Sequence, residues 1–297
     1  MIGILGAGSL GRLWAATLPV GRVAFIARPD EPTGTDLSYR FRPVKGPETT
    51  IRIPFVRPGD EPGLILVTTK AGDTVDAISG VINRLPGATP ILLFQNGLGS
   101  QQAVAAQWPH HPILAASTTE GANRPDPDLL VHAGSGDTWI GAMTDPARAC
   151  VDNVIAMFQA TGLKVHQEPD ILQRLWQKLI INAGINPYTA ILDCPNGEIL
   201  ASALYQSTID DLCGELSRLM AGAGQGEKSP EALRHRIEQV ARNTAGNTSS
   251  MRADVLHHRR TEIDFINGYL ARLGNELGIE TPVNQMLTER VQQLSSP

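Results

Sequence analysis

The sequence predicts an α/β domain over residues 1–167, followed by an all-α domain over residues 168–297. Three observations support this fold class. Short apolar runs, typical of buried parallel strands, alternate with helix-like stretches in the first part. A glycine-rich turn joins the first strand to the first helix. From residue 170 onward the pattern is helical, interrupted by short turns.

The first strand is followed directly by a glycine-rich turn. The apolar run Met1–Leu5 is followed by Gly6-Ala7-Gly8-Ser9-Leu10-Gly11 and a helix from Arg12. The first glycine permits the tight turn, the second lets the backbone approach a pyrophosphate, and the third lets helix and strand pack closely. The helix N-terminus offers N–H groups to the phosphates. This order predicts a Rossmann-type dinucleotide site rather than a plain glycine-rich turn.

The second strand, Val23–Ala27, ends in Arg28. Dinucleotide binders that use NAD have an acidic residue near this point, which accepts a hydrogen bond from the ribose 2′-OH. A guanidinium instead suits a 2′-phosphate, so the sequence favours NADP over NAD. The alternative is a solvated arginine paired with the acids of the following loop, Asp30 and Glu31.

Two further buried strands each end in a polar residue. Residues 33–62 are expected to form a small β excursion or loop, and Gly63–Thr69 then leads to Lys70. After a helix over residues 74–85, the strand Pro90–Phe94 ends in Gln95-Asn96-Gly97. Ligands of open α/β sheets collect beyond the carboxyl ends of the strands, where Lys70 and Asn96 stand. The alternatives are a snorkelling lysine and an ordinary turn.

The rest of the α/β domain is predicted from apolar runs and turn residues. Asp170 is expected to cap the next helix as its N-cap. The expected elements are a strand over residues 113–119, a hairpin of strands 128–132 and 138–141 joined through Gly134-Ser135-Gly136, a helix over 146–161 and a strand over 163–166.

The stretch Leu175–Pro187 predicts a helix that is buried nearly all round. Lys178, Asn182 and Asn186 stand at i, i+4 and i+8, and therefore share one face. Burying an unpaired ammonium costs several kcal/mol, and an unbonded amide about 1–3 kcal/mol. Either partners elsewhere in the chain satisfy these groups, or the face binds a polar ligand.

A long helix is predicted from Arg252 to Gly274, and a last short helix after Pro282. The long helix contains Glu262, which the pattern also allows as an exposed helix glutamate. Capping residues are dense just before it, and a serine such as Ser250, taken alone, is more often simply an N-cap.

Composition excludes several classes of function. The 297 residues carry a net charge of -5, without the basic patches that bind nucleic acid or membrane surfaces. Neither a signal peptide nor a long apolar span is expected. The three cysteines have neither disulfide nor zinc spacing, so a cytoplasmic protein without a metal is expected. The oligomeric state is left open between a monomer and a homodimer.

In their order along the chain, these motifs resemble the ketopantoate reductase (2-dehydropantoate 2-reductase) family. The glycine turn is common to many dehydrogenases, whereas the helix with one lysine and two asparagines and the segment around Glu262 are specific to that family. The matching motifs are Gly6–Gly11, Lys70, Gln95–Gly97, Trp176–Leu179, Asn182, Asn186-Pro187, Cys194–Glu198, Asn247–Met251 and Thr261–Gly268.

The resemblance implies that NADPH reduces the C2 ketone of 2-dehydropantoate to (R)-pantoate in pantothenate and coenzyme A synthesis. Lys178 would donate the proton, and Glu262 would share the active site with substrate and cofactor. The resemblance places substrate contacts at Asn96, Lys178, Asn182, Asn186, Asn196 and Ser250. It places cofactor contacts at Gly6, Ala7, Gly8, Ser9, Leu10, Gly11, Arg28, Lys70, Asn96, Ala122 and Glu262.

The chemistry of these residues agrees with a ketone reduction. Hydride arriving at a ketone carbon develops negative charge on the oxygen, which an ammonium stabilises and then protonates. One departure from the family pattern is Asp73, where a glutamine is frequent. Two alternatives remain: a sibling reductase of another branched 2-keto acid, and a non-catalytic NADPH-sensing regulator.

Overall fold

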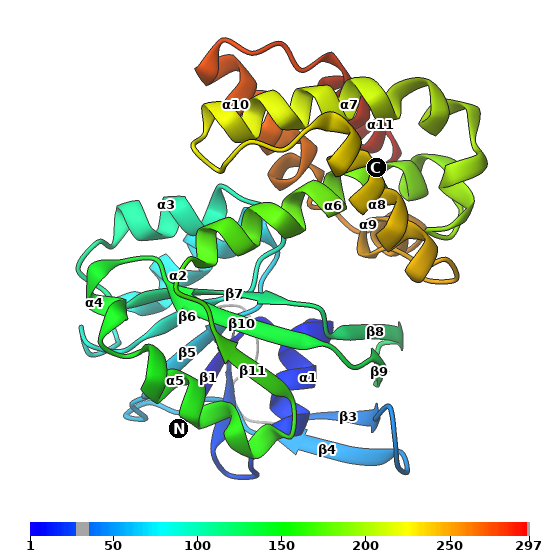
Figure 1. The fold of residues 1–297 in the computed structure, drawn as a ribbon. Helices are drawn as coiled ribbons and strands as arrows, with labels where there is room; N and C mark the ends of the chain where they lie inside the picture. Colours follow the sequence, from blue (N-terminus) through cyan, green and yellow to red (C-terminus); the bar gives the residue numbers. More distant parts are fainter. Residues whose placement is uncertain (28–35, 296–297) are drawn as a thin grey trace. The chain divides into compact units, whose positions relative to one another are not determined.

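The fold was determined as a computed structural model, which describes residues 1–27 and 36–295. Contacts between residues divide the chain into two compact units, whose elements are labelled in Figure 1. The first unit comprises Met1–Gln95 and Ser100–Arg174, and the second comprises Asn96–Gly99 and Leu175–Pro297. The first is an α/β unit and the second is mostly helical, which confirms the predicted fold class. The boundary after residue 167 stays a prediction.

A seven-stranded sheet is the centre of the first unit (Figure 1). Five of its strands are parallel, β10 runs antiparallel to β7, and β11 is parallel to β10. In spatial order the strands are β2 (Val23–Ile26), β1 (Ile2–Leu5), β5 (Leu64–Val67), β6 (Ile91–Leu93), β7 (Ile113–Thr118), β10 (Asp137–Ala142) and β11 (Lys164–Gln167).

Both faces of the five parallel strands are buried, because the side chains that alternate along each of them enter two separate cores. Ile4 and Leu66 pack in one core with α1 (Ser9–Thr17) and α5 (Val151–Phe158). The neighbouring residues Leu5 and Val67 pack in the other with α2 (Thr74–Ile82) and α3 (Ser100–Gln107). Burial on both faces explains why the strands read as continuous apolar runs.

The predicted hairpin between residues 128 and 141 is wrong. The strand β9 (Leu129–Gly134) belongs to a second sheet, of order β4-β3-β9-β8, whereas β10 pairs with β7 in the main sheet. The other members of the second sheet are β4 (Thr49–Ile53), β3 (Leu37–Arg42) and β8 (Gly121–Asp126). The sequence of β8, GANRPD, has no apolar alternation. Periodicity therefore could not identify β8 as the antiparallel partner of β9.

The helix predicted over residues 146–161 is interrupted. It consists of α4 (Asp145–Arg148), α5 and a short 3₁₀ turn, Gln159–Thr161. The interruption falls at Ala149 and Cys150, where Cys150 has φ -114° and ψ -2° and precedes α5 as its N-cap residue. The apolar pattern continues through this point because α5 still buries Val151, Val154 and Phe158.

The second unit consists of helices joined by short turns (Figure 1). Its first helix, α6, begins with four residues that belong to the first unit, 171–174, and continues into the second. The helix starts after Asp170, whose Oδ1 accepts a hydrogen bond from the N–H of Gln173 at 3.0 Å, which confirms the predicted N-cap. The helical elements are α6 (Ile171–Leu192), η3 (Glu198–Ala201), α7 (Ala203–Gly222), α8 (Pro230–Asn243), α9 (Ser250–Leu256), η4 (Ile263–Phe265), α10 (Asn267–Leu277) and α11 (Pro282–Ser295).

The predicted long helix from Arg252 to Gly274 is also wrong. Helix α9 ends at Leu256, and His258 takes a left-handed conformation with φ 51°. The N–H of Arg259 then returns to the carbonyl of Asp254 at 2.8 Å. A helix cannot continue through such a reversal, so the chain restarts in η4 and α10. The break places Glu262 in a turn before η4 rather than on a helix surface.

Helix α11 is anchored at its N-terminus by a buried carboxylate. Glu215 of α7 is 1% exposed and accepts from the N–H groups of Val283 and Asn284, at 2.7 and 3.0 Å. It also accepts from Nδ2 of Asn284 at 2.7 Å. Burial raises the pKa of Glu215, and these three donors oppose the shift.

Among the described residues, none of the helices combines the length and apolarity needed to cross a membrane.

Candidate active site

The glycine turn of the first unit has the geometry that dinucleotide binding needs. Gly6 has φ 108°, and a Cβ atom there would stand 2.8 Å from the backbone nitrogen of Thr69. A Cβ on Gly11 would collide with the carbonyl oxygen of Gly6. A Cβ on Gly8 would instead meet no atom within 4 Å. The first and third glycines are therefore required by the fold, and the second leaves space beside the backbone for a pyrophosphate.

Arg12 fixes the glycine turn from the side. Its Nε donates to the carbonyl of Ala7 at 3.0 Å, and its Nη1 donates to the carbonyl of Pro127 at 2.8 Å. The guanidinium also lies 5.0 Å from the ring centroid of Tyr39. Burial is the main cause that lowers the pKa of Arg12. These contacts hold the turn in place before any ligand binds, which limits the ordering cost of binding.

The other predicted cofactor residues of this unit lie on separate elements. Lys70 lies three residues after the end of β5, and its carbonyl accepts from the N–H of Asp73 at 3.0 Å. Ala122 lies in β8 and packs partly against the core that contains α1. Arg28 lies outside the described residues. The carboxyl end of β5 and the glycine turn after β1 share one edge of the sheet, because these two strands are paired in parallel.

In the second unit, α6 is as buried as predicted. None of the residues from 174 to 192 is exposed, and Asn186 is only 8% exposed. Lys178, Asn182 and Asn186 share one face of this continuous helix, about 6 Å of rise apart. Burial lowers the pKa of Lys178 to about 8, and the carboxylate of Glu262 opposes this shift. An ammonium of this kind releases its proton far more readily than an exposed lysine.

Glu262 is buried, which excludes the reading of an exposed helix glutamate. It is 8% exposed, and its Oε2 accepts from Nδ2 of Asn96 at 3.0 Å. Asn96 belongs to the four-residue segment Asn96–Gly99, which is part of the second unit although its sequence neighbours belong to the first. The structure thus brings Asn96, Lys178 and Glu262 into one electrostatic group, although they are far apart in the sequence.

The backbone holds Asn96 beside Glu262. The N–H of Leu98 donates to the carbonyl of Phe265 at 2.8 Å. Gly97 has φ 77°, and a Cβ there would collide with the same carbonyl oxygen. Only glycine allows this approach, because any other residue would be strained in φ and would also overlap Phe265. Asn96-Gly97 is therefore more than an ordinary turn.

Ser249, and not Ser250, caps helix α9. Its Oγ accepts from the N–H of Arg252 at 3.0 Å and lies 2.6 Å from Oγ1 of Thr189. The Thr189 hydroxyl donates to the carbonyl of Asn186 at 2.7 Å. Because that bond uses the threonine's hydrogen, Ser249 must donate to Thr189. This chain of bonds ties α9 to α6, while Ser250 itself is exposed as the first residue of the helix.

Asn196 follows the turn after α6 and is 9% exposed. Its backbone N–H donates to the carbonyl of Asn247 at 3.1 Å, and its Nδ2 donates to Oγ1 of Thr244 at 2.9 Å. Sequence reasoning identified Asn196 but missed Thr244 and Thr189. Neither threonine belongs to a motif. Only the fold shows that the hydroxyl of Thr189 contacts Asn186 and that the hydroxyl of Thr244 contacts Asn196.

The predicted site residues form two groups, one in each unit. The described residues include no cluster of three or more side chains of the types that bind metals. The first unit contains Gly6, Ala7, Gly8, Ser9, Leu10, Gly11, Lys70 and Ala122, and the second contains Asn96, Lys178, Asn182, Asn186, Asn196, Ser250 and Glu262.

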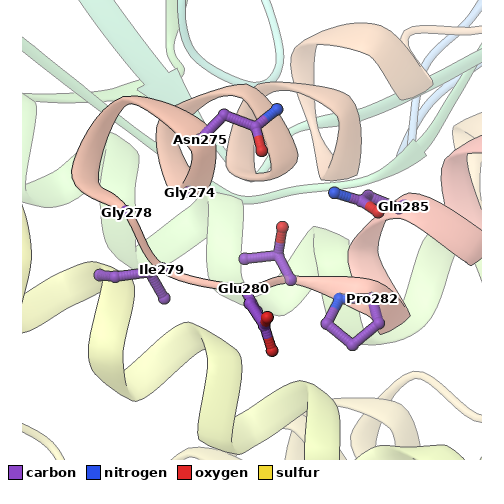
Figure 2. Close-up of a pocket in the computed structure, with 8 residues that line it drawn as sticks. Gly274, Asn275, Gly278, Ile279, Glu280, Pro282 and Gln285 are labelled. Carbon is purple, nitrogen blue, oxygen red and sulfur yellow. The ribbon is translucent and has the colours of Figure 1, made fainter.

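A separate depression of about 560 Å³ lies between the end of α10 and the start of α11 (Figure 2). Its lining includes Asn275, Glu280 and Gln285, and none of the predicted site residues. The carboxylate of Glu280 would repel an anionic substrate. The first N–H groups of α11 are already bonded to Glu215. We therefore do not assign a 2-keto acid to this depression.

Both units match one protein family. Residues 2–145 match the family described as "Ketopantoate reductase PanE/ApbA", and residues 170–295 match "Ketopantoate reductase PanE/ApbA C terminal". The 2-dehydropantoate 2-reductase of Vibrio cholerae is 36% identical over 98% of this chain and 96% of its own. That of Archaeoglobus fulgidus is 30% identical over 99% of this chain and 97% of its own.

Solved structures share the fold over nearly the whole chain. A PanE/ApbA family ketopantoate reductase from Ralstonia eutropha has a TM-score of 0.83 and 25% identity, covering 99% of this chain and 98% of its own. D-mandelate dehydrogenase in complex with NADH and anilino(oxo)acetate has a TM-score of 0.86 at 24% identity, over 99% and 98%. A dimeric ketopantoate reductase from Staphylococcus aureus has a TM-score of 0.82 at 19% identity, over 99% and 98%.

Proposed function

Because the chain belongs to the ketopantoate reductase family, we propose that it reduces 2-dehydropantoate to (R)-pantoate in pantothenate and coenzyme A biosynthesis. The observation that carries this proposal is the polar face of α6. In a helix with no exposed residue from 174 to 192, Lys178 has a lowered pKa and the carboxylate of Glu262 acts on it. Such an arrangement suits proton transfer to a small polar ligand. The reaction is assigned to the cytoplasm, in agreement with the cysteine content.

Lys178 is the proposed proton donor. Reduction of the C2 ketone leaves negative charge on its oxygen, and an ammonium at that oxygen stabilises the charge and then supplies the proton. Glu262 favours the charged form of Lys178 and accepts a hydrogen bond from Asn96, so it orients both groups. Asn96, Asn182, Asn186, Asn196 and Ser250 are the proposed contacts to the remaining polar atoms of the substrate.

NADPH is the proposed cofactor, and when bound it supplies the hydride. The open space beside Gly8 and the tight approaches at Gly6 and Gly11 fit a pyrophosphate at this turn. Ala7, Ser9, Leu10, Lys70 and Ala122 are the further proposed contacts in the first unit, with Asn96 and Glu262 from the second.

Arg28 is proposed to bind the 2′-phosphate of NADPH. The substitution Arg28→Ala is then expected to weaken the binding of NADPH much more than the binding of NADH, as measured by the Kd of each cofactor. Equal losses for the two cofactors would mean that Arg28 does not read the 2′-phosphate.

The decay of NADPH absorbance tests the reaction itself. We expect oxidation of NADPH with 2-dehydropantoate, little with ketoisovalerate and none without a ketone. Faster turnover of ketoisovalerate would favour the sibling reductase of another branched 2-keto acid. An NADPH-sensing regulator would bind the cofactor and oxidise none of it with either ketone.

Light scattering would separate the two proposed oligomeric states, a monomer and a homodimer.

A further inference from the structure

A threonine outside every sequence motif contacts one of the proposed substrate residues. Thr244 directly follows α8, and its Oγ1 accepts from Nδ2 of Asn196 at 2.9 Å. The same hydroxyl donates to the carbonyl of Val240 at 2.8 Å. A carbonyl oxygen only accepts, so the threonine hydrogen must point to Val240. The lone pairs of Oγ1 therefore face Asn196.

These hydrogen-bond directions determine how the Asn196 amide is turned. A lone pair on Thr244 attracts the NH₂ group of Asn196 and repels its carbonyl oxygen. The backbone at this point is fixed as well, because the N–H groups of Asn196 and Gly197 donate to the carbonyls of Asn247 and Ala245, at 3.1 and 3.0 Å. The amide is consequently locked with Nδ2 toward Thr244 and Oδ1 away from it.

The oxygen turned away from Thr244 lacks a hydrogen bond. Oδ1 of Asn196 is buried and has no partner among the described residues, and the whole residue is 9% exposed. Buried acceptors are nearly always satisfied, so an open acceptor in a proposed substrate site indicates that a ligand donor completes it. An amide turned the other way would offer an N–H donor instead, which suits a ketone or carboxylate oxygen.

We propose that Thr244 is a positioning residue that makes the site selective for a substrate hydroxyl. This inference rests on the proposed reduction of 2-dehydropantoate. At neutral pH that molecule has one hydrogen-bond donor, the hydroxyl on C4, because its ketone and carboxylate oxygens only accept. Oδ1 of Asn196 accepts from this hydroxyl, and Thr244 keeps the amide in the orientation that allows it.

The test compares 2-dehydropantoate with 3,3-dimethyl-2-oxobutanoate, which has the same carbon skeleton and no hydroxyl. The measured quantity is the ratio of the two kcat/KM values. In Thr244→Val the amide loses its acceptor, and we expect the ratio to fall about three- to tenfold, mostly through KM for 2-dehydropantoate. Thr244→Ser keeps the hydroxyl and is expected to keep the ratio of the parent.

Thr208→Val is a matched control, because Thr208 also donates to the carbonyl four residues earlier, Leu204, at 2.7 Å and pairs with a side chain, Tyr188. It should leave the ratio unchanged. Thr244→Ala gives the same measurement if the valine variant does not fold.

An unchanged ratio in the Thr244 variants would overturn the inference, as would an equal loss of kcat/KM for both substrates, which marks a purely structural role. Both results would leave the proposed reaction intact. Absence of turnover by the parent chain with either ketone would instead remove the proposed reaction, and this inference with it.

Discussion

At the scale of single residues, the environment of Lys178 determines the chemistry. The sequence identified this lysine because an ammonium does not belong in an apolar helix. The structure adds that burial lowers its pKa to about 8, near the pH of most cells. A general acid works best when its pKa lies close to the working pH. The burial of the Lys178 ammonium costs stability, but the lowered pKa that results is useful for proton transfer.

Substituting Lys178→Ala is expected to lower kcat by about 10²–10⁴-fold, because the ammonium acts mainly on the charge of the transition state. The Kd for NADPH, measured by fluorescence titration, should change little. Asn186→Ala on the same face is a useful comparison and should act mainly on KM. A near-normal kcat in Lys178→Ala would contradict the role of proton donor.

The same lysine predicts a pH dependence. Donation needs the protonated form, which predominates below the pKa of about 8. We expect kcat/KM for ketone reduction to be level below pH 8 and to fall about tenfold per pH unit above it. An exposed lysine would lose its proton only near pH 10.4. In Lys178→Arg, whose guanidinium stays charged, any residual activity should lack this decline; a decline that persists would assign it to another group.

At the scale of elements, the segment Asn96–Gly99 carries a residue of the proposed site on a very short piece of chain. Its geometry depends on Gly97, with φ 77°, and on the hydrogen bond between Leu98 and Phe265. Glu262 is fixed by the turn that replaces the predicted long helix. Both groups are thus positioned by irregular backbone, which is frequent where structure serves function.

Substituting Gly97→Ala is expected to cost more than about 1–2 kcal/mol of stability, because the left-handed φ adds to a collision with Phe265. Activity should fall as well, since the shift displaces Asn96 from Glu262. Gly224→Ala is the control: Gly224 has φ 68° but nothing within 4 Å of an added Cβ. Chemical denaturation gives both stabilities, and equal losses would show that the contact with Phe265 does not matter.

Elements with one strong periodic signal were predicted well from sequence. The five parallel strands are buried on both faces and most residues of α6 are buried, and the apolar runs of these elements predict this burial directly. The errors arose where two elements share one apolar pattern, as in the break at Cys150 and in the turn at His258. The hairpin prediction failed because the partner of β9 is a polar strand, and pairing depends on contacts distant in sequence.

At the scale of the whole molecule, cofactor binding should raise the free energy of unfolding. A ligand that binds only the folded state at about 100 times its Kd adds about 2.7 kcal/mol. For units of this size that raises the Tm by about 2–4 °C per kcal/mol. We expect NADPH to raise the Tm of the parent chain clearly more than NADH does at the same concentration, as measured by differential scanning fluorimetry.

Gly8→Ala sharpens this test, because the added Cβ has open space and Gly8 has an ordinary φ of -73°. The variant should fold with the Tm of the parent but lose most of the shift caused by NADPH. Gly80→Ala, with equally open space in α2, should keep the full shift. A full shift in Gly8→Ala would contradict a pyrophosphate at this turn.

The candidate site was predicted only in part. Residues that are anomalous in their local pattern, such as Lys178 and the glycines, are visible in the sequence. Glu262 and Ser250 were ambiguous in the sequence. The structure shows that Glu262 is buried, and that Ser249 rather than Ser250 caps helix α9. Thr244 could not be predicted, because its importance depends on a contact with a residue 48 positions away.

The placement of Asn96–Gly99 also bears on how such proteins diverge. The segment lies in the first half of the sequence, whereas its partners Glu262 and Phe265 lie in the second half. A chimera that joins the first half of one relative to the second half of another would pair a loop from one parent with a carboxylate and a carbonyl from the other. The two halves are therefore expected to evolve together rather than to recombine as independent cassettes.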